Sequence, residues 1–234
     1  MLLYLGFMAE ALRATSLSLQ GIIFDLDGTV GDTLPVCFVA FREVFHSYLN
    51  RIYSDKEIRA MFGPTEEGMI LHAVPDRFEE AFTAYLAAYE KAHSACREPF
   101  PGIRQVIETL ERRGVRRAVV TGKGPRSAAI SLQVLGLADS FERVEAGSPD
   151  GNIKPKNMRR VVDAWGVDPA AVACVGDAPS DIRAAREIGA IPLAAAWAAT
   201  SDYEVLRALG PQKTFRRVEE FLDWIERHTD HQGV

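Results

Sequence analysis

Short apolar runs alternate with longer segments of helical periodicity along most of the chain. This alternation is typical of βαβ units built around a parallel sheet. Several of the runs are almost wholly apolar, as expected for strands that helices cover on both faces. The pattern predicts strands at residues 19–24, 117–120, 143–146, 171–175 and 191–195, and indicates a sixth near residues 214–217.

Helices are predicted between these strands, and glycine marks their ends. Helical periodicity runs through residues 103–113, 126–135, 156–165, 180–188, 203–209 and 218–227. Glycine just beyond a helix relieves the left-handed backbone conformation in which many helices end. Such a residue follows most of these segments, at Gly114, Gly136, Gly166, Gly189 and Gly210. The repetition of helix, glycine and strand predicts the α/β class with a doubly wound parallel sheet.

One segment departs from this alternation. Between residues 34 and 99 apolar residues recur at helical spacing, and no convincing strand is found. Aromatic residues dominate the recurring positions, for example Phe38, Phe41, Phe45, Phe78, Phe82, Tyr85 and Tyr89. We therefore predict a helical domain at residues 34–99, inserted after the first strand of an α/β core domain that comprises residues 18–33 and 100–230.

The composition places the chain among globular proteins that act on small molecules. Apolar residues make up 47% and charged residues 25%, which excludes wholesale disorder. The net charge of -5 argues against a general nucleic-acid binder, because such proteins normally carry a basic face. Three widely spaced cysteines suggest neither a disulfide framework nor a zinc site, so a reducing cytoplasm is the expected compartment.

No membrane segment is expected. The longest apolar runs, residues 1–9 and 193–199, are much shorter than the roughly 20 residues that span a bilayer. The first run also lacks the basic residues that begin a signal peptide. Translation could start at Met1 or equally at Met8.

Acidic and hydroxyl residues directly follow the most apolar predicted strands. Asp25 and Asp27 follow the first strand, Thr121 and Gly122 follow the second, and Asp177 follows the fourth. In an open parallel sheet, ligands bind in the crevice beyond the carboxyl ends of the strands. We therefore expect these residues to converge on one site.

Four carboxylates are expected at this site. Gly28 allows the sharp turn that Asp25 and Asp27 need to face it, and Asp181 lies one turn into the helix after Asp177. Two unit charges about 4 Å apart repel by about 4 kcal/mol at an effective dielectric constant of roughly 20, so the cluster should bind a cation or hold a proton. Because oxygen ligands predominate, Mg²⁺ is the expected ion. A single aspartate after a strand more often caps a helix or turn, but three such motifs together are improbable as unrelated caps.

These motifs resemble those of the haloacid dehalogenase (HAD) superfamily, over nearly the whole chain after residue 17. The helical insertion is similar to the cap of the subfamily that contains phosphoglycolate phosphatases, β-phosphoglucomutases and haloacid dehalogenases. The resemblance implies a Rossmannoid core with a small helical cap. The matching segments are Asp25-Leu26-Asp27-Gly28-Thr29-Val30, Thr121-Gly122, Lys154-Pro155, and Gly176-Asp177 through Asp181.

The resemblance also implies an activity and residue roles. The chain would be a Mg²⁺-dependent phosphoric monoester hydrolase that forms an aspartyl-phosphate on Asp25, with Asp27 as general acid and base. Thr121 and the Gly122 amide would bind phosphoryl oxygens, and Lys154 would offset negative charge. The implied metal ligands are the side chains of Asp25 and Asp177 and the main-chain carbonyl of Asp27, with Asp181 in support.

Two neighbouring lysines compete for the phosphate-facing role. Lys154 is preferred to Lys156 because a proline follows it, which matches the context of the family's lysine. Lys123 is interpreted as a flanking loop residue. Asp32 and Thr33, where the chain enters the insertion, are interpreted as caps of the following helix.

The substrate contacts within the cap are expected in the turn at residues 62–68, through Gly63, Thr65 and Glu66, although glycine and proline there could equally mark only a turn. Residues 34–99 contain 7 Lys+Arg and 10 Asp+Glu, so nothing marks the cap as a trap for polyanions. We predict a small phosphorylated metabolite as substrate.

Other functions remain open at this stage. Asp27 disfavours dehalogenase and phosphonoacetaldehyde hydrolase activity, because those enzymes lack this aspartate. A β-phosphoglucomutase-like mutase keeps both aspartates and adds a cap histidine, for which neither His46 nor His72 has a matching loop context. A non-enzymatic alternative is a catalytically silent phosphate-binding or receiver-like protein. Receiver domains are much shorter and lack the insertion, and an intact Asp27 argues against a silent relative.

Overall fold

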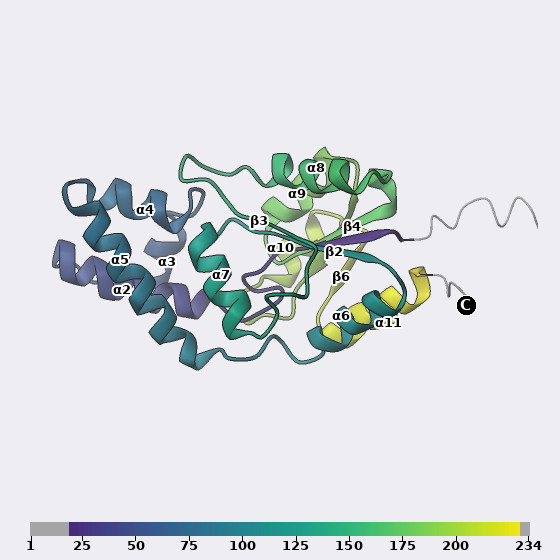
Figure 1. Cartoon of the computed structure of the whole chain (residues 1–234), viewed down its shortest axis with the longest axis horizontal. Coiled ribbons are helices and arrows are strands. Elements are labelled where there is room, and N and C mark those ends of the chain that lie inside the picture. Colours follow the sequence, from purple (N-terminus) through teal and green to yellow (C-terminus); the bar gives the residue numbers. More distant parts are fainter. Residues whose placement is uncertain (1–18, 230–234) are drawn as a thin grey trace, which may run out of the picture.

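The computed structural model describes residues 19–229, which form a sheet unit and a helical unit lying end to end (Figure 1). We call residues 19–33 and 100–229 the sheet unit, and residues 34–99 the helical unit. The two candidate start residues, Met1 and Met8, and the terminal His231 lie outside the described range. Within that range no helix has the length and apolar character needed to cross a membrane.

The sheet has six parallel strands in the order β3-β2-β1-β4-β5-β6. The order reverses between β1 and β4, which is the topological switch point of a doubly wound fold. The predicted fold class and all six predicted strands are confirmed, with ends that differ by up to two residues. Their bounds are β1 Gly21–Phe24, β2 Arg116–Val120, β3 Arg143–Glu145, β4 Val172–Gly176, β5 Ile191–Ala195 and β6 Lys213–Phe215.

Helices cover both faces of the sheet, and β1 shows how the strands serve both layers. Ile22 and Phe24 pack under the helices α6 (Ile103–Arg112), α7 (Pro125–Val134) and α11 (Val218–His228). Ile23 points to the opposite face, where α8 (Lys154–Trp165) and α9 (Pro179–Glu187) lie (Figure 1). A short α10 (Tyr203–Ala208) packs beside β5 through Leu206. Because both faces are buried, the strands contain continuous apolar runs.

The predicted helices of the sheet unit are present, with one informative difference at α8. This helix begins at Lys154, two residues before the predicted start. Pro155 is accommodated because a proline in the first turn gives up no intrahelical hydrogen bond. The predicted glycines follow their helices, and Gly114, for example, has a φ of 65°.

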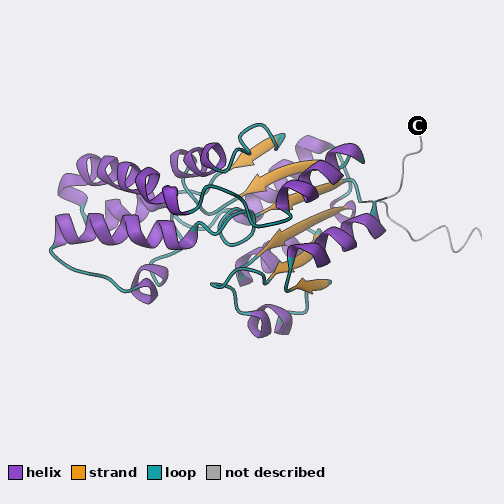
Figure 2. Ribbon diagram, turned by 90° about the horizontal axis from the view of Figure 1, so that it is seen from below, coloured by secondary structure: helices purple, strands orange, loops and turns teal. Residues whose placement is uncertain are grey.

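The helical unit contains α2 (Leu34–Leu49), α3 (Asp55–Arg59), α4 (Glu66–Ala73) and α5 (Phe78–Ala92), with single 3₁₀ turns at Pro75–Arg77 and His93–Ala95. The two long helices, α2 and α5, pack side by side (Figure 2). Aromatic rings fill the space between them, and the centroids of Phe41 and Tyr85 are 4.6 Å apart. The aromatic residues that recur at helical spacing in the sequence therefore form the buried faces of these two helices.

The helical unit is attached to the sheet unit by two chain crossings and by α7. The Phe100 amide donates to the Val30 carbonyl at 3.0 Å. The two segments that connect the units therefore lie side by side. On α7, the Ser131 hydroxyl lies 2.7 Å from the Tyr89 hydroxyl and 3.1 Å from His93 Nε2, both on the helical unit. Ile130 of α7 also packs against the aromatic core.

Candidate active site

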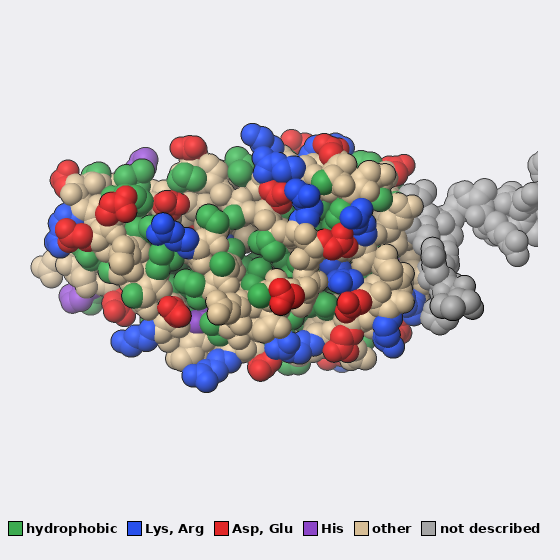
Figure 3. All heavy atoms as spheres, in the orientation of Figure 1, with side chains coloured by type: hydrophobic (Ala, Val, Ile, Leu, Met, Phe, Trp, Pro, Cys, Tyr) green, Lys and Arg blue, Asp and Glu red, His purple; other side chains and the backbone are tan. Residues whose placement is uncertain are grey.

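The buried charged side chains of residues 19–229 gather where the two units meet. In contrast, acidic and basic side chains are interspersed over the outer surface in view in Figure 3. Burying an ionised group is costly unless it is paired, so such a gathering is expected at a site that uses the charges. The buried carboxylates and ammonium groups are those of Asp25, Glu66, Lys123, Lys154 and Asp181.

The loops after β1 and β4 form the centre of the site. Asp25 follows the last residue of β1, and Asp177 follows the last residue of β4, the neighbouring strand. Gly28 turns the first loop with a φ of 76°, and a Cβ at this position would lie 2.2 Å from Asp177 Oδ2. A side chain at position 28 would therefore displace the carboxylate, so glycine serves both the turn and the close approach.

Three of the four predicted carboxylates converge there. One oxygen from each of Asp25, Asp177 and Asp181 lies within 4.8 Å of the others. Lys154 Nζ donates to Asp25 Oδ1 at 2.8 Å and to Asp181 Oδ1 at 2.5 Å, whereas Lys156 is exposed. The structure thus brings Lys154, and not Lys156, to the aspartates.

The negative charge of the three clustered carboxylates exceeds the single positive charge of the Lys154 ammonium beside them. Burial, reinforced by Asp181 and Asp27 and opposed by Lys154, raises the pKa of Asp25 to about 7. The pKa of Asp177 is raised well above its usual value by burial and then by the charges of Asp25 and Asp181. Burial disfavours the charged form of Lys154, but Asp181 and Asp25 outweigh it and raise the pKa of the ammonium. Three carboxylates facing one ammonium, without a histidine or cysteine ligand among them, fit a hard divalent cation.

The Asp27 side chain points to different partners. Its Oδ1 accepts a hydrogen bond from the Thr33 hydroxyl and lies 3.2 Å from Lys123 Nζ. Thr33 stands at the N-cap position of α2 but makes no side-chain cap bond, and Asp32 Oδ1 has no hydrogen-bond partner. The interpretation of these two residues as helix caps is therefore wrong, because the Thr33 hydroxyl donates to a carboxylate instead.

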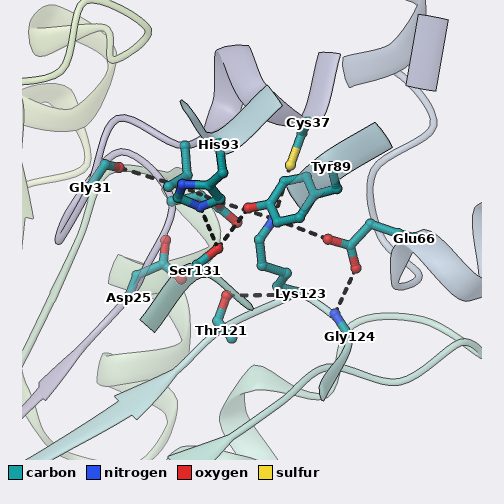
Figure 4. A network of polar contacts seen from close by, with 12 residues as sticks. Asp25, Gly31, Cys37, Glu66, Tyr89, His93, Thr121, Lys123, Gly124 and Ser131 are labelled. Atoms are coloured by element: carbon teal, nitrogen blue, oxygen red, sulfur yellow. Dashed lines mark hydrogen bonds and ion pairs between the residues drawn. The ribbon is translucent and has the colours of Figure 1, made fainter. Parts of the chain in front are cut away.

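Lys123 is likewise more than a flanking loop residue. Its side chain is 1% exposed, and Nζ lies 3.0 Å from Glu66 Oε1 (Figure 4). The same Nζ lies 3.2 Å from Asp27 Oδ1. Burial would lower the pKa of Lys123, but the charges of Asp27 and other neighbours raise it well above the usual value. One feature of the sequence indicated the contact between Lys123 and Glu66, because Glu66 is in the turn that was expected to face the site. A buried lysine needs an acidic partner, and Glu66 supplies one.

The hydroxyl and amide predicted to hold phosphoryl oxygens follow β2. Thr121 is buried, and its hydroxyl oxygen accepts from the Lys123 amide at 3.2 Å. Thr121 and Gly122 both line the cavity described below. Asn152, which the sequence analysis missed, also lines it and accepts from the Lys154 amide at 2.9 Å, so it helps to begin α8 at the correct residue.

A cavity of about 440 Å³ lies between the two units. Its sheet-unit wall contains Asp25, Asp27, Asp177 and the two buried lysines. Its helical-unit wall is mostly apolar and includes Leu34, Phe41, Phe62 and Met69. Of the three predicted cap contacts, Gly63 and Glu66 line this cavity. The third, Thr65, is buried behind the wall and accepts from the Gly68 amide at the start of α4.

Among the curated relatives of this chain are proteins with phosphatase names. The chain is 25% identical over 211 residues to the pyrophosphatase PpaX of Halalkalibacterium halodurans, covering 89% of this chain and 98% of that protein. It is 28% identical over 184 residues to the phosphoglycolate phosphatase of Neisseria meningitidis, covering 74% of this chain and 78% of that protein.

Solved structures share the fold. One is CbbY from Rhodobacter sphaeroides in complex with phosphate, with a TM-score of 0.72 and 19% identity over 87% of this chain and 96% of that chain. A family model, haloacid dehalogenase-like hydrolase, matches residues 22–195. This match includes β2 through β5, all of β1 except its first residue, and every aspartate of the site. It confirms the resemblance on which the assignment of motifs depended. The chain belongs to the haloacid dehalogenase-like hydrolase family.

Proposed function

We propose that this hydrolase is a Mg²⁺-dependent phosphatase that cleaves a small phosphorylated metabolite through an aspartyl-phosphate on Asp25. The phosphatase names of its relatives support the class, phosphoric monoester hydrolase. The observation that carries the proposal is the position of Asp25, which is buried at the switch point with one oxygen held by Lys154. The carboxylate is thereby oriented, and its position is fixed before substrate arrives.

In the proposed reaction, an Asp25 oxygen attacks phosphorus and the bond to the leaving oxygen breaks. Asp27 gives its proton to that oxygen, and in the second step it takes a proton from the water that attacks the phosphoaspartate. Thr121 and the Gly122 amide hold phosphoryl oxygens, and Lys154 compensates the negative charge. Each group would act from the position described above.

The residues that would hold Mg²⁺ are the side chains of Asp25 and Asp177 and the Asp27 carbonyl, with Asp181 in support through Lys154. The ion would supply positive charge that stabilises the phosphoryl oxygens in the transition state. Without the ion, the three carboxylates would face only the Lys154 ammonium, and the substrate phosphate would add further negative charge.

The helical unit limits the size of the substrate. We propose that residues 34–99 are a cap domain, that they close the cavity of about 440 Å³, and that Gly63 and Glu66 are on its substrate-facing wall. A cavity of this size suits a metabolite rather than a macromolecule. The three cysteines are free thiols, which supports a cytoplasmic location.

The test is hydrolysis of a panel of phosphorylated metabolites by the purified protein with Mg²⁺. We expect many turnovers per enzyme, and we expect Asp25→Asn to abolish them while circular dichroism stays unchanged. Mass spectrometry after an acid quench should find one phosphoryl group on Asp25 of the wild type. The matched control is Asp163→Asn, an exposed aspartate on α8 that should keep wild-type rates.

The alternatives give different results in the same experiment. A receiver-like or silent protein would give at most one equivalent of product, and a mutase would return an isomeric phosphate ester. Substantial turnover by Asp25→Asn would remove Asp25 as the nucleophile.

A further inference from the structure

Lys123 is a buried cation that the proposed reaction does not use. It comes from the loop after β2 in the sheet unit, and Figure 4 shows its side chain beside Glu66. The ammonium group contacts the carboxylates of both Asp27 and Glu66. Nζ also lies 2.9 Å from Cys37 Sγ and 4.6 Å from the centre of the Tyr89 ring. Contacts on several sides hold the ammonium in one place, so it can fix the position of whatever it binds.

Glu66 holds Lys123 from the helical unit. One carboxylate oxygen, Oε1, accepts from Lys123 Nζ at 3.0 Å, and the other, Oε2, accepts from the Gly124 amide at 2.7 Å. Both oxygens therefore bind the same loop of the sheet unit. A two-point contact restricts rotation of the carboxylate more than a single bond would.

The start of α4 is seated tightly against the sheet unit around this contact. The Thr65 amide donates to the Ser148 carbonyl at 3.0 Å. A Cβ at Gly68 would lie 2.3 Å from the Pro149 carbonyl oxygen, so only glycine permits this approach. The position of Glu66, and through it that of Lys123, thus depends on the helical unit being seated on the loops after β2 and β3.

Lys123 and Thr33 both bind the same oxygen of Asp27. Each contacts Oδ1, and none of the polar contacts found for Asp27 among residues 19–229 involves Oδ2. Asp27 itself lines the cavity. Because Oδ1 accepts from the Thr33 hydroxyl and forms an ion pair with Lys123, we expect Oδ2 to carry the proton that Asp27 transfers, and the two contacts restrict rotation of the carboxyl group.

We propose that Lys123, held by Glu66, is a positioning residue for Asp27 that orients Oδ2 toward the leaving-group oxygen. The inference rests on the proposed phosphatase function. In the first step the Oδ2–H proton passes to the leaving oxygen as its bond to phosphorus breaks, and Asp27 is left as a carboxylate beside the Lys123 ammonium. When the helical unit packs on the sheet unit, Glu66 therefore positions Lys123, and Lys123 orients the general acid Asp27.

The test compares two aryl phosphates that differ in their need for an acid. Phenyl phosphate releases a basic phenolate that requires protonation, whereas 4-nitrophenyl phosphate releases a stable anion that requires little. The measured quantity is kcat/KM, which reports the steps up to departure of the leaving group. The variants are Lys123→Met and the double variant Glu66→Gln with Lys123→Met. The double variant leaves no unpaired buried carboxylate at position 66, and its amide oxygen can still accept from the Gly124 amide.

We expect both variants to lose about 100-fold on phenyl phosphate, the order expected for a misplaced general acid, and less than about 10-fold on 4-nitrophenyl phosphate. The matched control, Lys156→Met, removes an exposed lysine and should leave both rates unchanged. Equal losses on the two esters in the double variant would overturn the inference, because they would mean that Lys123 only seats the helical unit. Unchanged rates on both esters would overturn it as well.

Failure of the proposed function is distinguishable from failure of this inference. If wild-type protein hydrolyses neither ester nor any metabolite, or if Asp25→Asn remains active, the phosphatase mechanism itself fails. If the wild type is active and Asp25→Asn is not, an equal loss on both esters removes only the positioning role of Lys123.

Discussion

The two units differ in the number of charged side chains that they bury. The helical unit has an aromatic core in which Phe41, Phe82 and Tyr89 each contact Tyr85, and Glu66 is its one buried carboxylate among the described residues. The sheet unit buries both aliphatic and aromatic side chains, among them Phe24 and Phe221, and it buries its charges at one edge of the sheet. A hydrogen-bonded parallel sheet holds loops at fixed separations, whereas packed helices form a wall whose shape can vary. The contrast agrees with the proposal that the sheet unit performs the chemistry and the helical unit encloses the substrate.

The largest expected effect is the loss of activity when the metal is removed from the sheet unit. Removal of divalent metal by a chelator should abolish turnover, because the carboxylates of Asp25, Asp177 and Asp181 then face too little positive charge. Addition of Mg²⁺ should restore activity and raise the melting temperature, since an ion that binds only the native state stabilises it. Asp177→Asn should reduce that increase in melting temperature. Full activity in chelator would contradict the assignment of a metal to this edge.

Truncation of one aromatic residue in each unit tests whether the units unfold separately. Phe24→Ala and Tyr85→Ala should each lower the free energy of unfolding by about 3–5 kcal/mol, because both side chains are completely buried. All three tryptophans, Trp165, Trp197 and Trp224, are in the sheet unit. Tryptophan fluorescence therefore follows that unit, whereas far-ultraviolet circular dichroism follows both.

In urea unfolding we expect the two signals to coincide for Phe24→Ala. For Tyr85→Ala the circular dichroism signal should begin to change at lower urea than the fluorescence, because only the helical unit is weakened. Coincident transitions in both variants would show that the two units unfold as one cooperative structure. That result would contradict the prediction that the helical unit can unfold separately.

A smaller effect is expected at the contact between α5 and α7. Ser131→Ala should lower the free energy of unfolding by about 1–3 kcal/mol, because it leaves the buried Tyr89 hydroxyl and His93 Nε2 without their shared partner. Ser127 on the same helix is a matched control, since its buried hydroxyl has no hydrogen-bond partner. Ser127→Ala should therefore change stability very little. Equal effects of the two substitutions in urea unfolding would argue that the hydrogen bonds do not join the units.

The smallest effect concerns pH. Burial lowers the pKa of His93 from the usual 6.5, so the folded protein favours the neutral ring. The unfolded chain binds the proton more readily, and stability should fall as pH decreases through 6.5 toward the lower folded pKa. We expect His93→Gln to reduce this dependence between about pH 8 and pH 5, and His46→Gln, on an exposed residue, to preserve it. An unchanged slope in His93→Gln would exclude His93 as its source.

Much of the fold followed from local patterns, and the exceptions have physical causes. Apolar runs and glycine ends located β1 and the helices around it, because burial on both faces and left-handed helix ends restrict residue type strongly. The start of α8 was missed by two residues, since Pro155 looks like a boundary in sequence but is tolerated in a first helical turn.

The acidic cluster was predictable because two of its members, Asp25 and Asp177, directly follow strands. Asp25 and Asp177 could be expected to meet once β1 and β4 were taken as parallel neighbours. The partners of the Asp27 side chain were not predictable, because Thr33 had a plausible alternative as a helix cap and hydrogen bonds are made by whichever group lies closer in space.

The sequence by itself determined the class of fold, the edge at which the carboxylates meet and the family of hydrolases, since each of these depends on residues adjacent along the chain. Only the tertiary structure decided that Lys123 is buried between Asp27 and Glu66, and that Thr65 lies behind the cavity wall. Such contacts join loops from separate elements, and their geometry depends on how the helical unit packs on the sheet unit. No short segment of the sequence encodes that packing.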